Sequence, residues 1–267
     1  MSKLDVVQTT RLTLDNRFKF RCHKGVKCFT KCCSNIDILL TPYDVVRLKD
    51  RLGISAGEFL NEYTYMKVDD QTSHPYAMLQ MSNDKEKKCP FVTPDGCEVY
   101  TDRPASCRYY PIGQGTYKKQ GEKGPEEEEF YFFIREKHCL GYEEDTEWTI
   151  ASWREDQEVD LYDRINREWK SLQLRKQLPG QAELDVKKQT LFYMASYDFD
   201  SFRRFIFESR FLEVFDIDDE TLEKIKSDDI ELIQFGARYL KDVMMLEQTM
   251  KVKDQALKER EENMKKK

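Results

Sequence analysis

Cysteine is the residue type in this sequence with the clearest chemistry. The eight cysteines are Cys22, Cys28, Cys32, Cys33, Cys89, Cys97, Cys107 and Cys139. Four thiolates complete a site for a zinc ion or an iron-sulfur cluster, so the chain carries enough thiols for two such sets. The spacing alone does not separate zinc from iron, or one centre from two. The sequence therefore predicts that all of these cysteines are metal ligands.

Two other interpretations of the cysteines are weaker. Disulfides form in oxidising compartments, and residues 1–10 do not resemble a secretory signal. The adjacent pair Cys32 and Cys33 would form a strained bridge with each other. Ordinary core thiols would be scattered along the chain, whereas no cysteine follows Cys139. We therefore expect reduced thiols in the cytoplasm, gathered in the first part of the chain.

Two arginines and two histidines lie next to cysteines in the sequence. Arg103 and Arg108 flank Cys107, where a guanidinium lowers a thiol pKa, offsets the charge of a tetrathiolate centre or binds an anionic ligand. The same arginines could instead pair with nearby carboxylates. We predict that both support the bound cofactor. His23 and His138 each adjoin a cysteine, but neighbours in a strand face opposite ways, so we do not expect them to be ligands.

Composition excludes several other classes of protein. The 267 residues include 44 Lys and Arg against 50 Asp and Glu, a formal charge of −6, so a nucleic-acid partner is not expected. The mean hydropathy is −0.76, and no stretch approaches the roughly 20 apolar residues of a membrane-spanning helix. Aromatic residues make up 12% of the chain, which is enough apolar bulk for a core. We expect a folded protein of the cytoplasm without a membrane partner.

Short elements must position the cysteines. Residues 36–40 alternate in the manner of a strand, and a helix that Thr41 caps should follow until Gly53 ends it. Ser55 and the glutamate three residues later form a capping box for a second short helix. A third begins near Pro104, because proline is tolerated in a first helical turn. This half of the chain therefore predicts small, irregular α and β elements.

Turn-forming residues indicate a hairpin between two of the cysteines. Residues 94–96 turn the chain between Cys89 and Cys97, which predicts that each arm carries one cysteine. The segment 113–129 is rich in Gly, Lys and Glu, and we expect it to be an exposed loop. A strand is predicted to follow it over 130–134.

The second half of the sequence is typical of helices. Apolar residues recur there at spacings of three and four. They are Val159, Tyr162, Ile165, Trp169 and Leu172. Further helices are predicted over 184–194, 200–209, 219–226 and 228–250. The whole predicts an α+β protein with a cysteine-cluster metal-binding domain at 1–142, a helical domain at 143–250 and a charged tail at 251–267.

The order of these residues resembles the YkgJ-type cysteine-cluster proteins, which are described as zinc- or iron-chelating domains. The resemblance rests on Phe20-Arg21-Cys22 through Cys32-Cys33, then Ile38 to Asp44, Cys89-Pro90-Phe91, and Cys97-x-Val99-Tyr100-x2-Arg103-Pro104-x2-Cys107-Arg108-x-Tyr110-Pro111. It extends to Cys139 and implies that all eight cysteines are the chelating set. The first two cysteines stand further apart here than is usual in the family. Flagellin lysine-N-methylase has a similar cluster, thought to hold iron and sulfide.

Three functions are open at this point. The first is a cytoplasmic metal-binding protein that holds zinc, iron or an iron-sulfur cluster through the cysteines. The second is an iron-sulfur enzyme such as a protein lysine methyltransferase; against it, the sequence has neither G-x-G-x-x-G after a strand nor the C-x3-C-x2-C spacing of radical enzymes. The third is an interaction protein in which the helical half binds a protein partner and the metal site is structural. Whether the chain is an enzyme is open.

Overall fold

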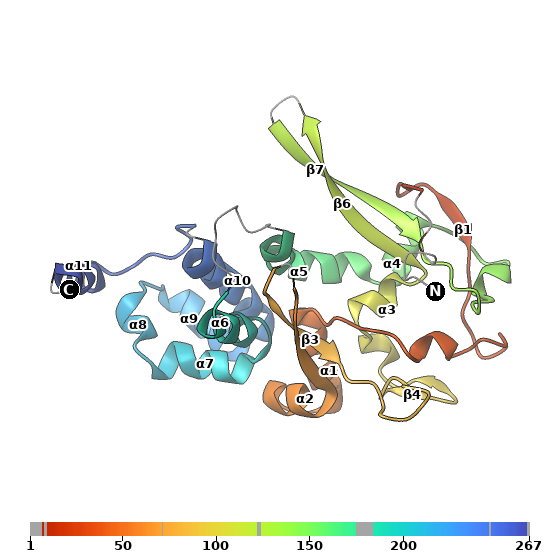
Figure 1. Ribbon diagram of the computed structural model, residues 1–267, viewed down its shortest axis with the longest axis horizontal. Helices are drawn as coiled ribbons and strands as arrows, with labels where there is room; N and C mark the ends of the chain where they lie inside the picture. The colour runs from red at the N-terminus through yellow and green to blue at the C-terminus, as the bar shows by residue number, and fades with distance from the viewer. Residues whose placement is uncertain are drawn as a thin grey trace. The chain divides into compact units, whose positions relative to one another are not determined.

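The fold combines helices with small antiparallel sheets, which confirms the predicted α+β class (Figure 1). The computed structural model describes residue 7 and residues 10–70, 72–121, 124–174, 184–245 and 247–265. The chain divides into two compact units. The first comprises Met1–Ile38 and Gln80–Asp163, and the second comprises Leu39–Leu79 and Arg164–Lys267. All eight cysteines therefore lie in the first unit.

The two units cut across the ranges that we predicted as domains. Those ranges, 1–142, 143–250 and 251–267, keep the cysteine-rich half continuous, whereas the inserted segment Leu39–Leu79 packs within the second unit. The units describe which segments pack together, and the predicted ranges concern which parts would fold alone. The domain limits therefore stay a prediction.

The inserted segment begins with the two helices that the capping residues predict. Helix α1 (Pro42–Leu52) starts at a capping box in which Thr41 and Asp44 exchange hydrogen bonds. It ends at Gly53, whose φ of 68° lies in the left-handed region that glycine adopts without strain. Helix α2 (Ala56–Tyr63) starts at a second capping box of the same kind. Both predictions are confirmed because these signals act within a few residues.

The strand predicted over 36–40 does not form. Leu39 makes only an isolated bridge to Met78, and the Leu40 amide donates to the carbonyl of Ala77 at 2.9 Å. The neighbouring strand β3 (Pro75–Leu79) pairs instead along its length with β2 (Thr64–Val68). Because α1 begins directly after this contact, the chain leaves the sheet before a ladder can form.

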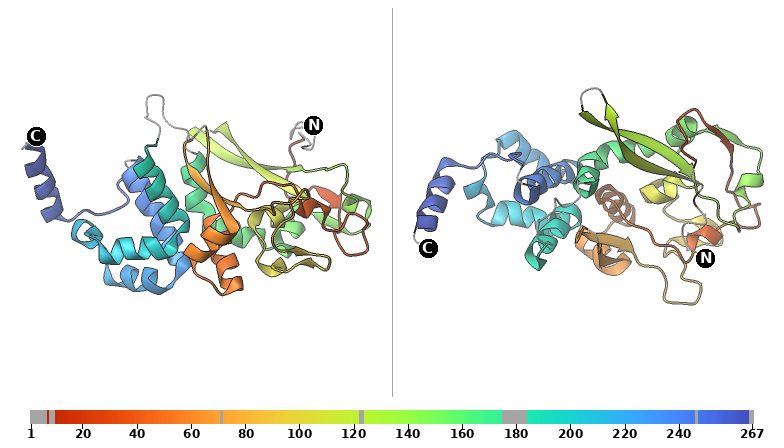
Figure 2. Two further views of the ribbon diagram at one scale, coloured as in Figure 1. Left: turned by 60° about the horizontal axis from the view of Figure 1, so that its bottom comes forward. Right: turned by 45° about the horizontal axis from the view of Figure 1, so that its top comes forward.

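The rest of the second unit is helical, as predicted (Figure 2). Its helices are α6 (Val186–Tyr197), α7 (Phe199–Glu208), α8 (Phe211–Val214), α9 (Asp219–Ser227), α10 (Asp229–Met245) and α11 (Asp254–Lys265), which follow α5 (Val159–Leu174). All members of the predicted apolar stripe on α5 are buried. The predicted charged tail contains α11. Within the described residues, no helix has the length and apolarity to cross a membrane.

Gly236 lets two helices of this unit approach each other closely. A Cβ atom added at Gly236 of α10 would lie 2.5 Å from the carbonyl oxygen of Ala195 on α6 and 3.2 Å from the ring of Phe202. The first distance is shorter than any real contact of that kind. The glycine therefore sets the distance between α10 and α6.

The first unit is built from paired strands around an aromatic core. Strand β1 (Arg17–Lys19) pairs with β8 (Glu147–Thr149), which leads directly into α4 (Ile150–Asp156). The core contains Leu12, Phe18, Phe20, Ile112, Tyr131, Phe133, Ile150 and Trp153. These residues come from both ends of the unit's sequence. The core therefore holds together the two chain segments that carry the cysteines.

The prediction of an exposed loop over 113–129 is wrong. The structure has a long hairpin there, formed by β6 (Ile112–Gly121) and β7 (Gly124–Phe133) (Figure 1). Gly113 lies opposite Phe132, whose ring covers it so closely that an added Cβ would lie at 2.4 Å. The ring of Phe130 covers Gly115 in the same way. Both glycines therefore lie in a paired strand, where the missing side chain leaves room for an aromatic ring of the opposite strand.

Candidate metal centre

Short elements and loops of the first unit carry the thiols. The elements are η2 (Lys31–Cys33), β5 (Gly96–Cys97), which pairs with β4 (Val92–Thr93), and α3 (Ala105–Tyr109). They contain Cys32, Cys33, Cys97 and Cys107, and the remaining cysteines lie between elements. The predicted hairpin between Cys89 and Cys97 is confirmed, although its paired part is short. All eight cysteines are free thiols.

Four thiols come together in what we call the first thiol set. Its members are Cys22, Cys28, Cys32 and Cys139. Partial burial, followed by the proximity of the other three thiols, raises the pKa of Cys22 to about 12. Burial, Cys28 and Cys32 raise the pKa of Cys139. The Leu140 amide also donates to the Cys28 sulfur at 3.2 Å. These interactions bring together residues that lie far apart in the sequence.

We call the other four cysteines the second thiol set. Its members are Cys33, Cys89, Cys97 and Cys107. The Cys89 amide donates to the Cys33 carbonyl at 2.8 Å, which ties η2 to the start of the hairpin. Burial, and to a lesser extent Cys97, raise the pKa of Cys89 to about 11. Arg103 interacts electrostatically with both Cys97 and Cys107. The two sets meet where the Cys33 thiol hydrogen-bonds Cys32 and so raises the pKa of Cys32.

The thiol sets fit a metal in donor type, but they do not yet form a coordination sphere. In the described part of the chain, no three His, Cys, Asp or Glu side chains are arranged closely enough to hold an ion. A zinc site needs four sulfurs at about 2.3 Å from one point. Neutral thiols have no reason to converge on such a point, and the cation itself supplies the attraction.

The Arg108 side chain donates mainly to backbone carbonyl oxygens. It is 2% exposed. The guanidinium donates to the carbonyl oxygens of Arg103 at 3.1 Å and Gln157 at 2.8 Å, and also to that of Thr101. A second kind of contact is the ion pair with Glu158 at 3.1 Å. Arg108 thus joins η3 (Tyr100–Asp102) and α3 to the end of α4.

Arg103 is the arginine that lies beside the thiols. It is buried, and its guanidinium lies 3.9 Å over the ring of Tyr100 and donates to the Tyr100 carbonyl and the Gln157 amide oxygen. Burial raises the pKa of Cys97, and the charge of Arg103 opposes that rise. Arg103 therefore acts electrostatically on two of the predicted ligands, Cys97 and Cys107.

Two residues beside the first thiol set were missed by the sequence analysis. The Tyr110 hydroxyl donates to Glu136 Oε2 at 3.1 Å, and Tyr110 also hydrogen-bonds Cys139. The Glu136 carboxylate contributes to the raised pKa of Cys32 and lies 3.5 Å from Nε2 of His138. Nothing in their sequence spacing indicates these contacts, because Tyr110 and Glu136 are brought together by the fold.

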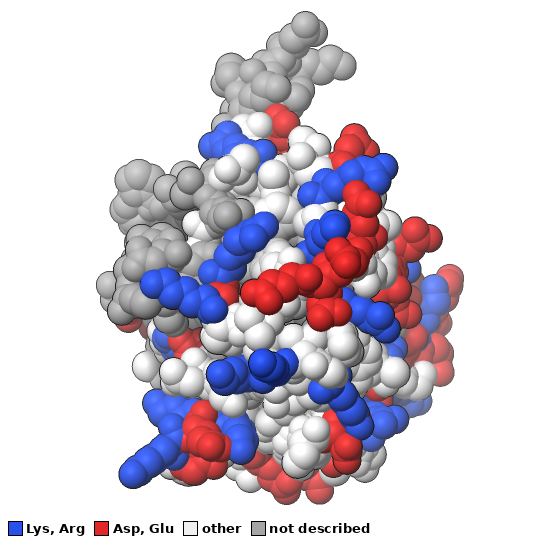
Figure 3. Space-filling model, turned by 90° about the vertical axis from the view of Figure 1, so that its right-hand side faces the viewer, with Lys and Arg blue, Asp and Glu red and all other residues white. Residues whose placement is uncertain are grey.

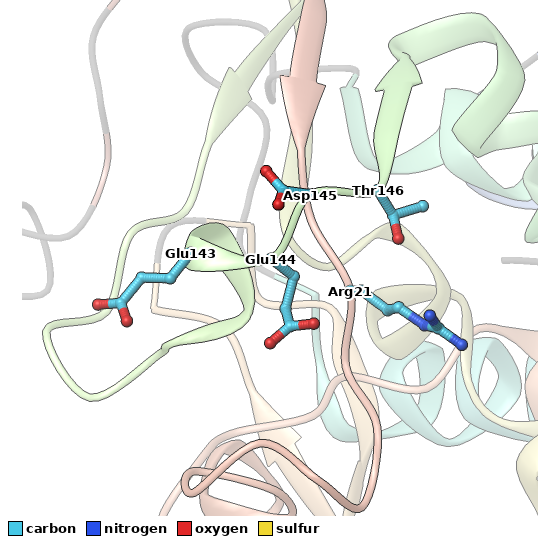
Figure 4. A pocket seen from close by; sticks show the side chains of 5 residues that line it. All are labelled: Arg21, Glu143, Glu144, Asp145 and Thr146. Atoms are coloured by element: carbon cyan, nitrogen blue, oxygen red, sulfur yellow. The ribbon is translucent and has the colours of Figure 1, made fainter.

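An acidic hollow is lined by residues that are close in the sequence to Cys22 and Cys139 of the first thiol set. Its volume is about 450 Å³. Arg21, Glu143, Glu144, Asp145 and Thr146 line it (Figure 4). The Arg21 amide donates to the carbonyl of Gly141, in η4 (Gly141–Glu143), at 3.0 Å. His23 Nε2 lies 3.0 Å from Glu144 Oε2, so this histidine faces a carboxylate.

Figure 3 shows Lys and Arg interspersed with Asp and Glu over the face that it draws.

Free thiols gathered in a small irregular unit define a cysteine-cluster metal-binding domain. Residues 21–140 match the family model CxxCxxCC, described as "Putative zinc- or iron-chelating domain". The matched residues of this chain, which are similar to that family, include all eight cysteines. No curated protein and no solved structure matches the chain. The similarity to flagellin lysine-N-methylase is not confirmed.

Proposed function

We propose that this chain is a metal-binding protein whose first unit holds two metal centres, one in each thiol set. The observation that supports the proposal is the gathering of eight free thiols in one unit, where Cys22 lies close to Cys28, Cys32 and Cys139, and Cys89 lies close to Cys97. Each thiol set supplies the four soft ligands that zinc, or an iron-sulfur cluster, requires. Metal chelation is also the function that the family description supports.

The resident metal is zinc or iron, and the protein works in the cytoplasm under this proposal. Thiolate sulfur favours both metals, and all of the proposed ligands are thiolates. Reduced thiols persist in the cytoplasm, whereas an oxidising compartment would pair them. Because burial and mutual proximity raise the pKa of several of these thiols, they are protonated without metal. Binding therefore releases protons.

The test is the metal content of protein purified without oxygen, measured by elemental analysis and absorption spectroscopy. We expect two metal centres in the wild-type protein. Cys139→Ser should remove the centre of the first set, and Cys97→Ser should remove the centre of the second. Ser106→Ala, next to Cys107, is the control and should keep both. A protein without metal, or a single centre lost in both cysteine variants, would contradict the proposal.

The same spectrum separates the alternatives for the metal. A zinc centre is colourless, whereas an iron-sulfur centre is brown and bleaches in air. A brown protein would make the iron-sulfur enzyme worth testing, by incubation with labelled S-adenosylmethionine and cell extract. If the chain is an interaction protein with a structural metal, it should bind a protein partner as long as the metal centres are intact. It should catalyse no reaction.

A further inference from the structure

Three aromatic side chains share the face of the β6–β7 hairpin that points away from the core of the first unit. Tyr131 and Phe133 of β7 belong to that core, and successive side chains of a strand point to opposite faces. The other face therefore carries Tyr117, Phe130 and Phe132, each of them only partly buried. We call these three residues the aromatic face. Apolar rings that gather on an outer face indicate an interaction surface.

Two glycines of β6 set the position of the phenylalanine rings. A Cβ atom added at Gly113 would lie 2.4 Å from the ring of Phe132, and one added at Gly115 would lie 2.5 Å from the ring of Phe130. Each ring thus lies across the neighbouring strand. The ring centroids of Phe130 and Phe132 are 6.2 Å apart, so the rings form a continuous π surface, which attracts cations.

The aromatic face already holds one guanidinium group. Cζ of Arg11 lies 4.2 Å from the ring centroid of Tyr117 and 5.3 Å from that of Phe130, both within the about 6 Å of a cation–π contact. The next residue, Leu12, exchanges two backbone hydrogen bonds of 2.9 Å with Tyr131. The chain's own contact therefore shows what this face accepts, which is an arginine carried on an extended backbone.

The edge of β7 continues beyond Tyr131 with acidic residues. In the described part of the chain, β6 and β7 form a sheet of two strands, and Leu12 bridges the outer edge only at Tyr131. Glu128, which lies opposite Tyr117 in the register, and Glu129 are exposed. An extended peptide that pairs along this edge continues the ladder that Leu12 begins. Every second side chain of the peptide then lies over the aromatic face.

We propose that the aromatic face is a docking site for an extended, arginine-containing segment of a partner protein. Arg11 is an internal competitor, and the arginine of the partner displaces its side chain. Arginine fits this face better than lysine does, because the planar guanidinium stacks on rings. The carboxylate of Glu128 favours a cationic segment over a neutral one. The surface lies outside both thiol sets, so the proposal does not depend on the metal.

Peptide binding to the full chain, purified without oxygen, tests this docking site. The probe is a fluorescein-labelled peptide of alternating arginine and threonine, whose fluorescence anisotropy reports binding. We expect weak binding to the wild-type protein and about two- to fivefold stronger binding to Arg11→Gln, the factor that corresponds to one exposed cation–π contact. Peptides with lysine or citrulline in place of arginine should bind less tightly.

Variants of the face and a matched charge control complete the test. Added to Arg11→Gln, either Tyr117→Leu or Glu128→Gln should reverse the gain, and the leucine keeps apolar bulk while removing the π surface. Arg17→Gln removes the same charge from β1, where Arg17 is 71% exposed and pairs with Glu147 at 3.2 Å. This control should leave the peptide affinity unchanged. A misfolded protein does not imitate the gain expected for Arg11→Gln.

Four results would overturn the proposal. The first is equal binding, or no binding, by the wild-type protein and Arg11→Gln. The second is an equal gain in Arg17→Gln, which would assign the effect to overall charge. The third is binding that survives Tyr117→Leu, because the peptide would then lie elsewhere. The fourth is a wild-type dimer in analytical ultracentrifugation that Arg11→Gln dissociates, because the face would then hold the arginine of a second copy.

Discussion

At the residue scale, Arg108 stabilises the backbone beside Cys107. Arg108→Ala leaves the carbonyls of Thr101, Arg103 and Gln157 without this donor, and we expect it to lower the free energy of unfolding by about 3 kcal/mol or more. Chemical denaturation measures the change. Glu158→Gln is the control, because the Glu158 side chain is 60% exposed and an exposed pair contributes less than about 1 kcal/mol. Equal costs in the two variants would refute the backbone role.

His74 makes the second unit sensitive to acid. It is 6% exposed, its ring stacks on Phe192 at 4.6 Å, and its Nδ1 has no partner among the described residues. Burial lowers the pKa of His74, although Asp69 partly opposes this. The unfolded chain therefore binds the proton first as the pH falls. The stability from neutral His74 is complete above about pH 6.5 and declines as the pH falls through the lower folded pKa.

The measurement for His74 is the free energy of unfolding at several values between about pH 7.5 and pH 5.5. Wild-type stability should fall by at most about 1.4 kcal/mol per pH unit from this residue. His74→Phe keeps a ring to stack on Phe192 and should flatten that part of the profile. An unchanged slope in the variant would assign the acid sensitivity to other groups.

At the scale of elements, the contact between α10 and α6 reverses the usual effect of a glycine substitution. Alanine is the better helix former by about 1 kcal/mol, so a solvent-facing glycine in a helix gains stability when replaced. At Gly236 the new Cβ would meet the Ala195 carbonyl at 2.5 Å. We therefore expect Gly236→Ala to destabilise the protein by about 1–3 kcal/mol, as measured by thermal or chemical unfolding.

Gly57 in α2 provides the matched control for that substitution. The nearest described atom to an added Cβ there is Asp200 Oδ2 at 3.9 Å, an ordinary contact distance. Gly57→Ala should be neutral or stabilising by up to about 1 kcal/mol. If both alanine variants change stability in the same direction, close helix packing is not what requires glycine at Gly236.

The elements also show what can and cannot be predicted from the sequence. Helix α1 was predictable because Thr41 and Gly53 act on their own neighbours. The β6–β7 hairpin was not, because its pairing depends on rings that cover Gly113 and Gly115 from the opposite strand. The site follows the same rule. Cysteine identity was readable from the sequence, but only the fold brings Cys22 close to Cys139.

At the scale of the whole molecule, metal removal should act on one unit. All eight cysteines lie in Met1–Ile38 and Gln80–Asp163, and binding energy of a metal is folding energy for the segments that it joins. Treatment with a chelator should therefore reduce the hydrogen-exchange protection of η2 and α3, and leave that of α6 and α10 unchanged. Mass spectrometry of peptides measures this. Equal loss in both units would show that the metal stabilises the entire chain.

The split of the first unit by the segment Leu39–Leu79 has a consequence for biosynthesis. At about 5–20 residues per second, a ribosome needs on the order of seconds to make that segment. The cysteines translated before Leu39 must stay reduced and without metal during this interval, because the other ligands of their sets have not yet been synthesised. Under the proposed arrangement, a nascent chain that stops before Gln80 contains neither complete ligand set. Under that arrangement, delivery of metal to the second thiol set follows translation of Cys107, and delivery to the first set follows translation of Cys139, so neither event guides the earliest folding steps.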